Sequence, residues 1–393
     1  MEKVSPKLRF SNFSDVWESQ KVKKFYKLIS GQHLGPSEYF NNPSNPRSLP
    51  YFTGPSDFTN DRLKLTKWTN KQKNTAIGSD ILFTVKGSGV GTMMFLHLQE
   101  IAIGRQLMAI RGENGNTNFL FQRLMPLQRN FVALASGNMI PGLSRGDILN
   151  TIISFPSLPE QQKIASFLSS VDERIELLEQ KKEKLEAYKK GVMQQIFSQQ
   201  IRFKQDDGSE FPDWEERKLG EVVKVFSGGT PKSSDPDLYG GDIPFIRSGE
   251  INASATELTL TEKGLKNSSA KMVEKGDLLL AIYGATSGEA GISKINGAIN
   301  QAILCIRWAG ENMFLLNWLK LNKNALTQKY LQGGQGNLSG EIVKSFELNI
   351  PSREEQIKIA AFLKSIDENL ETLDSQIQGL RIWKKGLLQQ MFV

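Results

Sequence analysis

The sequence predicts an α+β fold in which two α/β domains are joined by two long antiparallel coiled-coil helices, as an internal pseudo-twofold repeat. Three observations lead to this prediction. A 42-residue segment occurs twice in the 393-residue chain, its apolar residues follow a helical period in both copies, and each copy follows a block of short apolar runs and glycine-rich loops. The predicted α/β domains are residues 1–156 and 201–351, and the predicted helical segments are 157–200 and 352–393.

The duplication is visible when the chain is shifted by 195 residues. Pro156–Phe197 and Pro351–Phe392 then share 21 identical residues at 42 positions. The blocks before them match more loosely, as "GSDILFTVKG" ending at Gly87 does with "KGDLLLAIYG" ending at Gly284. We therefore expect each half to consist of a variable α/β block followed by a nearly constant helical block.

The constant blocks are predicted to be long helices. Each opens with a capping-box pattern, Ser157 with Glu160 and Ser352 with Glu355. Apolar residues then alternate at spacings of four and three, which is the seam of a coiled coil. Forty residues in a helix extend about 60 Å. Two such seams in one chain can pair, and related halves usually pair about a pseudo-twofold axis, which makes the helices antiparallel. Packing of each helix on its own block, or an intermolecular bundle, is the alternative.

Three lysines, Lys182, Lys189 and Lys384, occupy seam positions of these helices. A charged residue in a coiled-coil seam lowers stability and fixes partner and register. The seam is therefore expected to specify one pairing.

The variable blocks combine short strand-like runs with glycine-rich loops. Examples of the runs are Ile81–Val85, Leu107–Ile110 and Leu278–Tyr283. "KGSGVG" and "YGATSG" follow the same strand in the two halves. Such loops let the backbone approach a ligand closely, and ordinary turns are the alternative.

The net charge of +7 is unevenly distributed. Residues 1–156 contain 19 Lys+Arg and 10 Asp+Glu, a difference of +9, whereas residues 201–351 contain 17 and 19, a difference of −2. A basic first block suggests a polyanionic partner, and the second block would need a local basic patch to bind one.

Several function classes lack support in the sequence. No apolar run is long enough to span a membrane, and the single cysteine, Cys305, fits a cytoplasmic protein. His33 and His97 have no metal-ligand spacing around them. The chain lacks a phosphate-binding P-loop and the G-x-S-x-G motif of hydrolases. We expect no catalytic residue, no metal site and no cofactor in this chain.

The repeated phrase identifies a family. "PEQQKIASFLSSVDE" begins at Pro159 and "REEQIKIAAFLKSIDE" begins at Arg353. Together with "SGGTP" and "IPFIRSGEI" in the second block, this organisation resembles the specificity subunit of type I restriction-modification systems over the whole chain. The first block departs from the pattern, with "LISGQHLGP" and "LPYFTGPSDF" at the corresponding places, so its DNA contacts are less well defined.

The resemblance implies a recognition subunit without catalysis. Each variable block would be a target recognition domain that reads half of a bipartite site in double-stranded DNA, and the helices would hold the two domains apart. Two adenine methyltransferase subunits would dock on the repeated phrase, and restriction subunits would join through them. S-adenosylmethionine, ATP and Mg²⁺ would be used by those partners. The expected docking residues are Gln161, Lys163, Phe167, Asp172, Gln356, Lys358, Phe362 and Asp367.

Base edges in the major groove are read by arginine, lysine, asparagine, glutamine and hydroxyl side chains. The candidates in the first domain are Arg47, Lys86, Ser88, Arg105 and Gln106. The candidates in the second domain are Thr230, Lys232, Arg247, Ser248, Tyr283, Thr286, Asn300, Gln301, Gln335 and Asn337. Each could equally be a solvated loop residue or a residue that stabilises the fold.

Other functions remain open at this point. The chain could be the recognition subunit of a related methyltransferase or type II-like system, or a self-contained DNA methyltransferase. It could also be a coiled-coil scaffold without DNA contact, although the basic first block and the paired glycine-rich loops argue against a scaffold.

Overall fold

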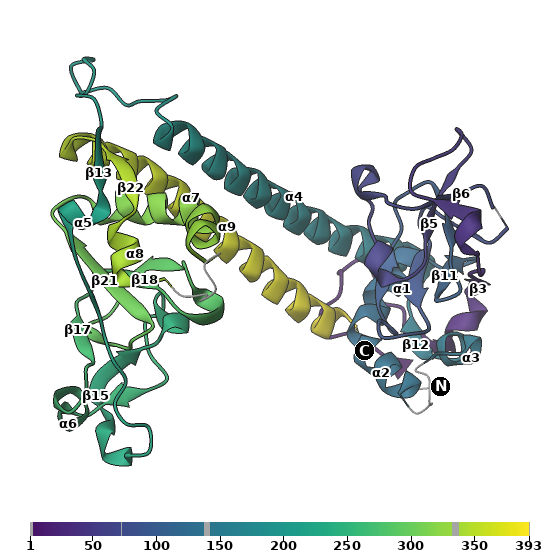
Figure 1. The fold of residues 1–393 in the computed structure, drawn as a ribbon. Coiled ribbons are helices and arrows are strands. Elements are labelled where there is room, and N and C mark those ends of the chain that lie inside the picture. Colours follow the sequence, from purple (N-terminus) through teal and green to yellow (C-terminus); the bar gives the residue numbers. More distant parts are fainter. Residues whose placement is uncertain (1–2, 72, 137–141, 332–337, 393) are drawn as a thin grey trace. The chain divides into compact units, whose positions relative to one another are not determined.

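The computed structural model describes residues 3–71, 73–136, 142–331 and 338–392. The chain divides into two compact units (Figure 1). Unit 1 combines residues 1–179 with residues 375–393, and unit 2 consists of residues 180–374. Each unit therefore contains one α/β block and a part of both long helices.

Unit 1 contains three sheets. The first has the order β1-β2-β12 (Lys3–Val4, Trp17–Lys21, Ile152–Phe155). The second has the order β3-β11-β8-β9 (Tyr26–Ser30, Leu107–Gly112, Ile81–Thr84, Met93–Phe95). The third has the order β4-β6-β5-β10-β7 (Tyr39–Phe40, Trp68–Thr69, Leu49–Phe52, Glu100–Ile103, Thr75–Ile77). The helices are α1 (Thr117–Leu124), α2 (Gln128–Ala135) and α3 (Arg145–Leu149), with short 3₁₀ turns η1 to η5 (Val22–Lys24, Pro36–Glu38, Pro55–Asp57, Arg62–Lys64, Met125–Leu127).

Unit 2 repeats this plan. β13 pairs with β22 (Glu215–Lys218, Glu347–Ile350). One four-stranded sheet has the order β14-β21-β18-β19 (Val223–Ser227, Ile303–Trp308, Leu278–Ala281, Ala290–Ile292), and the other has the order β16-β15-β20-β17 (Thr259–Leu260, Tyr239–Ile246, Gly297–Ile299, Lys271–Val273). Its helices are α5 (Leu219–Val222), α6 (Glu262–Lys266), α7 (Asn312–Leu331) and α8 (Gly340–Lys344), with 3₁₀ turns η6 to η8 (Pro236–Leu238, Ser248–Glu250, Gly284–Thr286).

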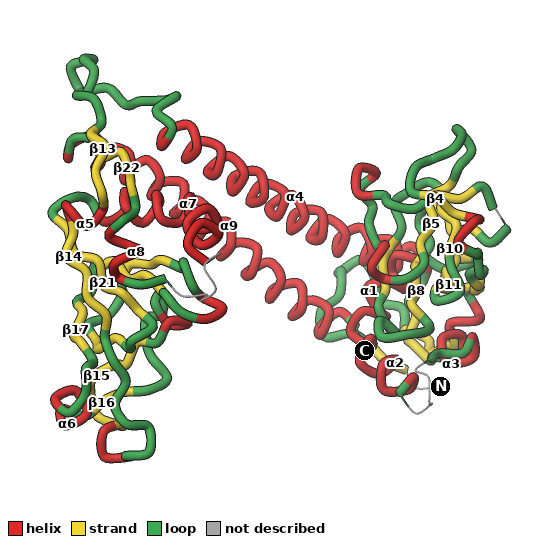
Figure 2. Tube along the Cα trace, viewed as in Figure 1, coloured by secondary structure: helices red, strands yellow, loops and turns green. Residues whose placement is uncertain are grey.

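The strand order confirms the duplication. The order β3-β11-β8-β9 in unit 1 corresponds strand by strand to β14-β21-β18-β19 in unit 2. Each unit also contains one parallel pair of named strands in otherwise antiparallel sheets, β5 with β10 and β15 with β20. Figure 2 shows the strands of both units in yellow. A parallel pair at the same place in both sheets is a specific topological feature, so the two blocks share one fold.

The long helices are α4 (Leu158–Phe197) and α9 (Arg353–Met391). Within each unit their segments are joined by ion pairs, and residues later in α4 pair with residues earlier in α9. The pairs are Asp172–Lys384 and Glu179–Arg381 in unit 1, and Lys182–Asp374 and Lys189–Asp367 in unit 2. The predicted antiparallel pairing is therefore confirmed in each unit, and all three seam lysines contact an aspartate of the opposite helix.

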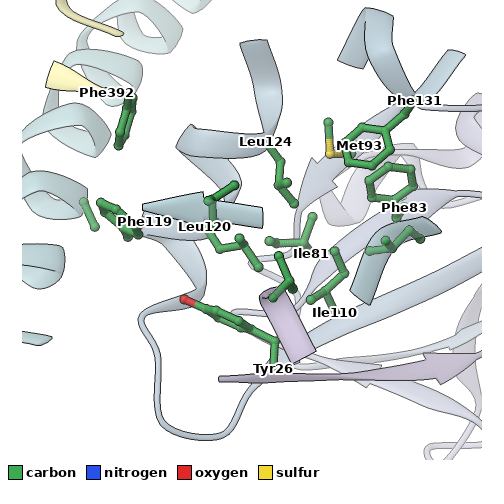
Figure 3. Close-up of a cluster of buried hydrophobic side chains, with 14 of the residues drawn as sticks. Tyr26, Ile81, Phe83, Met93, Ile110, Phe119, Leu120, Leu124, Phe131 and Phe392 are labelled. Carbon is green, nitrogen blue, oxygen red and sulfur yellow. The ribbon is translucent and has the colours of Figure 1, made fainter. Parts of the chain in front are cut away.

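The end of α9 completes the core of unit 1. Figure 3 shows Tyr26, Ile81 and Ile110 packed with Phe119 in this core, and Phe392 lies beside Phe119. The two phenylalanine rings are 5.5 Å apart. Because Leu387, Met391 and Phe392 are buried in this core, the fold of unit 1 includes the C-terminal part of α9 and the residue after it.

Unit 2 is completed in the same way by the end of α4. The ring of Phe197 lies 5.3 Å from that of Phe314. These two residues are 195 positions away from Phe392 and Phe119, respectively, so the contact is repeated in both copies.

The first turn of each long helix is attached to its α/β block by a buried glutamate. Glu160 accepts hydrogen bonds from Arg9 Nε at 2.7 Å and from Trp17 Nε1 at 3.3 Å. Glu355 is held by Arg202 and Trp214 in the same manner. The predicted reciprocal capping boxes are therefore wrong in their glutamate half, because these carboxylates bind the α/β block instead of the helix N-terminus.

Candidate nucleic-acid interface

Four of the five DNA-binding candidates of the first domain come together. Lys86 and Ser88 lie in the loop after β8, and Arg105 and Gln106 form the turn between β10 and β11. The Val85 N–H donates to the Gln106 carbonyl at 2.8 Å, which joins the two segments. Lys86 and Arg105 are exposed, and neither forms an ion pair with any described residue. The positive charges of Lys86 and Arg105 are therefore not neutralised by an ion pair with any described residue.

A third loop packs closely against the same edge. At Gly54 an added Cβ atom would lie 2.7 Å from Gln106 Oε1, and at Gly89 it would lie 2.4 Å from Pro55. Side chains at these glycines would push the loops apart. The three loops therefore form one continuous surface, which we call the first recognition surface.

An aspartate fixes the third loop. The N–H and the hydroxyl of Thr53 both donate to Asp57 Oδ2, at 2.7 and 2.6 Å, and Lys67 Nζ lies 2.8 Å from Asp57 Oδ1. Burial alone would raise the pKa of Asp57, but the bonds from Lys67 and Thr53 outweigh it and hold that pKa below its usual value. The positive charge of Lys67 is thus neutralised by Asp57 within the protein.

Arg47 belongs to a different loop. It is exposed, and its N–H donates to Asn45 Oδ1 at 2.8 Å. Hydrogen bonds join Ser48 of this loop to Asn70. The structure therefore places Arg47 in the loop of residues 41–48, which is joined to Asn70.

The second domain brings equivalent loops together. Thr230, after β14, donates its hydroxyl to Gln301 Oε1 in the turn between β20 and β21. The neighbouring Asn300 donates its N–H to the Ile246 carbonyl at 3.3 Å and accepts from the Ala302 N–H at 3.1 Å. Gln301 is exposed, whereas Asn300 is used to shape the turn. Thr230 and Gln301 form the core of the second recognition surface.

Arg247 does not present a free guanidinium. It pairs with Glu250 at 3.0 Å and with Glu257 at 2.5 Å. The hydrogen bond from Arg247 lowers the pKa of Glu250, so the pair remains charged at neutral pH. Arg247 therefore closes its own loop, as the Asp57–Lys67 pair closes the equivalent loop of the first domain, and a DNA contact by its 38% exposed side chain stays a prediction.

The other candidates of the second domain lie near its glycine-rich loops. Tyr283 is 37% exposed at the start of the turn η8, and Thr286 lies at the end of this turn. Ser248 begins η7 and is partly exposed. Lys232 is exposed and forms no ion pair within the described part of the chain. Gln335 and Asn337 lie outside the described residues.

Gln161 and Gln356 are structural residues. Both are buried, and each Nε2 donates to a proline carbonyl five residues earlier, at 2.9 Å. Their Oε1 atoms accept from the N–H groups of Asn116 and Glu311, respectively. Each amide is therefore buried and both donates and accepts within the chain, and the docking role predicted for the two residues stays untested.

Asp172 and Asp367 are also used within the chain. Asp172 accepts from Lys384 Nζ at 2.5 Å and from Gln122 Nε2 at 2.8 Å, and Asp367 accepts from Lys189 Nζ at 2.6 Å. They join the two helices, and because their side chains are 40% and 35% exposed, their docking role stays a prediction.

The remaining docking candidates lie on aromatic surfaces. In unit 1 the ring of Phe167 lies between Phe10, at 5.7 Å, and Trp383, at 6.1 Å, and Lys163 Nζ lies 5.6 Å from the Phe10 ring. We call Phe10, Phe167 and Trp383 the aromatic strip of unit 1. Trp383 is 49% exposed although it is a large aromatic residue.

Unit 2 carries the matching strip. Phe362 lies 5.7 Å from Phe203, and Lys358 Nζ lies 5.6 Å from the ring of Phe211. Tyr188, 53% exposed, is 195 residues before Trp383 and so occupies its place in the repeat. The aromatic pair Tyr188 and Trp383 was missed, although alignment of the two helices at this shift would have found it.

Among the described residues, no group of three histidine, cysteine, aspartate or glutamate side chains could hold a metal ion. In the same part of the chain no helix has the length and hydropathy needed to cross a membrane.

A model of a known protein family matches both halves of the chain. The model described as "Type I restriction modification DNA specificity domain" matches residues 12–187 and 212–380, one match for each half of the duplication. The chain belongs to this family. The predicted family is thereby confirmed, and the two matched regions correspond to the two α/β blocks with their helices.

Relatives of known name agree with the family match. The putative type I restriction enzyme MjaX specificity subunit of Methanocaldococcus jannaschii is 28% identical over 60% of this chain and 57% of its own length. The MjaVIII specificity subunit of the same organism is 26% identical over 95% of this chain and 91% of its own. The chain thus spans a little over half of the first relative and most of the second. Both relatives are named specificity subunits of type I restriction enzymes.

A solved structure shares the fold. The type I restriction-modification S subunit from M. genitalium superposes with a TM-score of 0.67 over 99% of both chains, at 19% sequence identity. The predicted α+β architecture with two repeated domains and two long helices is therefore confirmed.

Proposed function

We propose that this chain reads a bipartite sequence in double-stranded DNA and docks two methyltransferase subunits, through which restriction subunits join. One observation carries the proposal. The two halves share a fold and long helical segments that are identical at 21 of 42 positions, but the exposed side chains at equivalent recognition loops differ: Lys86 and Arg105 in the first domain correspond to Tyr283 and Gln301 in the second.

The difference between the loops fits two different half-sites. Arginine and lysine pair with guanine edges or phosphates, whereas glutamine pairs with adenine and tyrosine contacts bases by stacking. A domain that exposes Lys86 and Arg105 and a domain that exposes Tyr283 and Gln301 would prefer different sequences. The unpaired charge of Lys86 and Arg105 would also anchor the first domain on phosphates.

The similarity of the two long helices supports binding of the same kind of partner subunit to each of them. Phe167 and Phe362 have the same partly exposed setting, and Trp383 and Tyr188 are half-exposed at equivalent positions. Half-exposed aromatic side chains beside cations are typical of protein interfaces. Lys163, Phe167, Lys358 and Phe362 are therefore proposed docking residues, extended by the rest of both aromatic strips. S-adenosylmethionine, ATP and Mg²⁺ belong to the partners in this proposal.

The decisive experiment is methylome sequencing of cells that contain the methyltransferase partner, with and without this chain. We expect methylated adenines in both halves of one bipartite motif, and we expect this methylation to disappear without the chain. A methylome that does not depend on the chain would contradict the proposal. Methylation by the purified chain alone would instead support the self-contained enzyme.

A matched pair of variants tests the docking surfaces. Trp383→Ala and Tyr188→Ala each remove one half-exposed ring, and Leu134→Ala, 60% exposed on α2, is a control away from both strips. Each aromatic variant should lower the number of bound methyltransferase subunits from two to one, because a truncated interface anchor commonly costs more than 2 kcal/mol. Unchanged stoichiometry and affinity in both variants would remove the strips from the interface.

A further inference from the structure

A pocket lies at one edge of the first α/β block, lined by the loop that follows β3 and the segment that precedes β7. Its volume is about 560 Å³, and its lining includes His33, Glu38, Lys71 and Lys73. His33 and the two lysines are exposed. The pocket therefore gathers three side chains that can carry a positive charge around one carboxylate. We call it the edge pocket.

The edge pocket is continuous with the first recognition surface. The Gln32 N–H donates to the Ile103 carbonyl at 2.9 Å, and the Ile103 N–H donates to the Asn74 carbonyl at 3.3 Å. The Gln32 amide also donates to the Lys71 carbonyl at 3.3 Å. Ile103 is the last residue of β10 and directly precedes the turn that carries Arg105. Both segments of the pocket are thus joined to the strand that ends at this surface.

The duplication places His33 at a position that the second recognition surface uses. A shift of 197 residues aligns His33 with Thr230, and a shift of 196 aligns Arg105 with Gln301. The Thr230 hydroxyl donates to Gln301 Oε1, so this loop and this turn meet in the second domain. His33 therefore occupies the place of a residue at the core of the second recognition surface.

Lysines accompany this position in both domains. Unit 1 has Lys71 and Lys73, and unit 2 has Lys232 and Lys271, but no two of them align at the shift of 197. Lys73, Lys232 and Lys271 form no ion pair with any described residue. Contact with phosphates requires positive charge near the DNA backbone and carries no sequence information. Cations that recur at one edge without a shared position fit such a contact.

One carboxylate faces these cations. Glu38 accepts the Gly35 N–H at 2.9 Å and lies 3.6 Å from Lys71 Nζ. That hydrogen bond, and the charges of Lys71 and His33, hold the pKa of Glu38 below its usual value. Glu38 therefore stays charged at mildly acidic pH and offsets the charge of Lys71. Lys73 and His33 remain for an anion.

We propose that His33 and Lys73 bind one DNA phosphate at the first half-site, and that His33 does so in its protonated form. Histidine is the side chain that changes its charge between about pH 5 and pH 8. The first domain should therefore hold DNA more tightly as the pH falls through this range, whereas the second domain contains no histidine. This inference rests on the proposed DNA-reading function and adds a pH-dependent phosphate contact to it.

The test begins with selection of bound duplexes from a random library by the full-length chain. Failure to enrich any motif would count against the proposed function and would be seen before the edge pocket is tested. Binding of the enriched duplex is then measured at about pH 5.5 and at about pH 7.5 over a series of salt concentrations. Each pH gives one slope of log K against log salt.

We expect the wild-type chain to bind about tenfold more tightly at the lower pH in low salt, because a charged donor binds phosphate more strongly than a neutral one. Its salt slope should be steeper there by about 0.9, because one more counterion is released. His33→Gln should remove both differences. Lys73→Gln should flatten the slope by about 0.9 at both pH values.

His97 provides the matched control, because it is the other histidine of the chain. It follows β9, and Phe95 of that strand pairs with Ile81 at the start of β8. His97 is thus at the opposite end of β8 from the first recognition surface. His97→Gln should keep the pH dependence of the wild-type chain.

Three results would overturn the proposal. The first is a wild-type chain whose affinity and salt slope are the same at both pH values. The second is a His33→Gln chain that keeps the pH dependence. The third is a His33→Gln chain whose selected motif is relaxed at one position, because a phosphate contact does not read sequence and the histidine would then contact a base.

Discussion

Replacing Glu160 by alanine tests the buried anchor between α4 and the first α/β block. The Glu160 side chain is fully buried, and its two oxygens lie 2.7 Å from Nε and Nη2 of Arg9. Trp17 Nε1 donates to the same carboxylate. The substitution leaves a guanidinium that is only 13% exposed without its counter-charge, and it leaves the indole N–H without its acceptor.

The expected loss is about 3–5 kcal/mol of unfolding free energy for unit 1. Removing one member of a buried ion pair costs this much because the remaining charge stays buried and uncompensated. A buried donor that loses its acceptor costs about 1–3 kcal/mol in addition when water cannot reach it, and partial exposure of Arg9 reduces the total. With a urea m-value of about 2 kcal/mol per molar, the transition of unit 1 should move by about 2 M.

The assay is urea unfolding followed by hydrogen exchange, which resolves the two units separately. Glu160→Ala should reduce protection in unit 1, and the matched Glu355→Ala, which strips Arg202 and Trp214 of their acceptor, should reduce it in unit 2. A double variant with Arg9→Met and Glu160→Met should recover much of the loss, because no charge remains buried. A loss below about 1 kcal/mol in both single variants would refute this account of the anchor.

Four further predictions concern single features. Lys86→Ala should weaken DNA binding and flatten the dependence of log K on log salt by about one unit if the lysine contacts a phosphate; an unchanged slope and motif would exclude it from the interface. Lys384→Asp should destabilise unit 1 in urea by about 2 kcal/mol, and adding Asp172→Lys should restore most of it, because the pair at 2.5 Å is rebuilt in reverse; no recovery would show that the pair does not set the register. Phe392→Ala should lower the unfolding free energy of unit 1 by about 3 kcal/mol, because removal of the buried ring that packs on Phe119 leaves a cavity. A loss no larger than that of a substitution at an exposed position would contradict its place in the core. Burial raises the pKa of Cys305 to about 12, so a thiol reagent at pH 8 should not react with the native chain but should find one thiol after unfolding; rapid native reaction would contradict the burial.

The duplication and the helix pairing could be predicted because their signals are local or repeated. An apolar residue every 3.5 positions specifies a seam from a short stretch of sequence, and a 195-residue shift shows that the chain contains two such seams. The close backbone approach at Gly31 and Gly228 could also have been predicted, because a glycine stands at the same place in both halves. In both copies an added Cβ atom would collide with a facing backbone carbonyl, at 2.0 Å from Gly104 O and 1.7 Å from Ile299 O.

The roles of single polar residues could not be predicted because their partners are distant in sequence. Glu160 fits a capping box, but Arg9, 151 residues away, takes its carboxylate. Arg247 fits a DNA contact, but Glu257 and Glu250 neutralise it. A repeated residue such as Gln161 is equally compatible with docking and with a structural hydrogen bond, and only the structure shows the second role.

Comparison of the two halves separates structure from recognition within this one chain. The anchors at Glu160 and Glu355 are the same in both copies. Arg105 in one copy and Gln301 in the other stand at the same turn with different chemistry, and both are exposed. A residue that packs the fold must satisfy the same neighbours in both halves, whereas a residue that faces DNA is constrained only by its own half-site. Exposed positions that differ between the copies on a shared backbone are therefore where sequence preference should be sought, and exposed positions that agree, such as Phe167 and its counterpart Phe362, are where a partner common to both halves should bind.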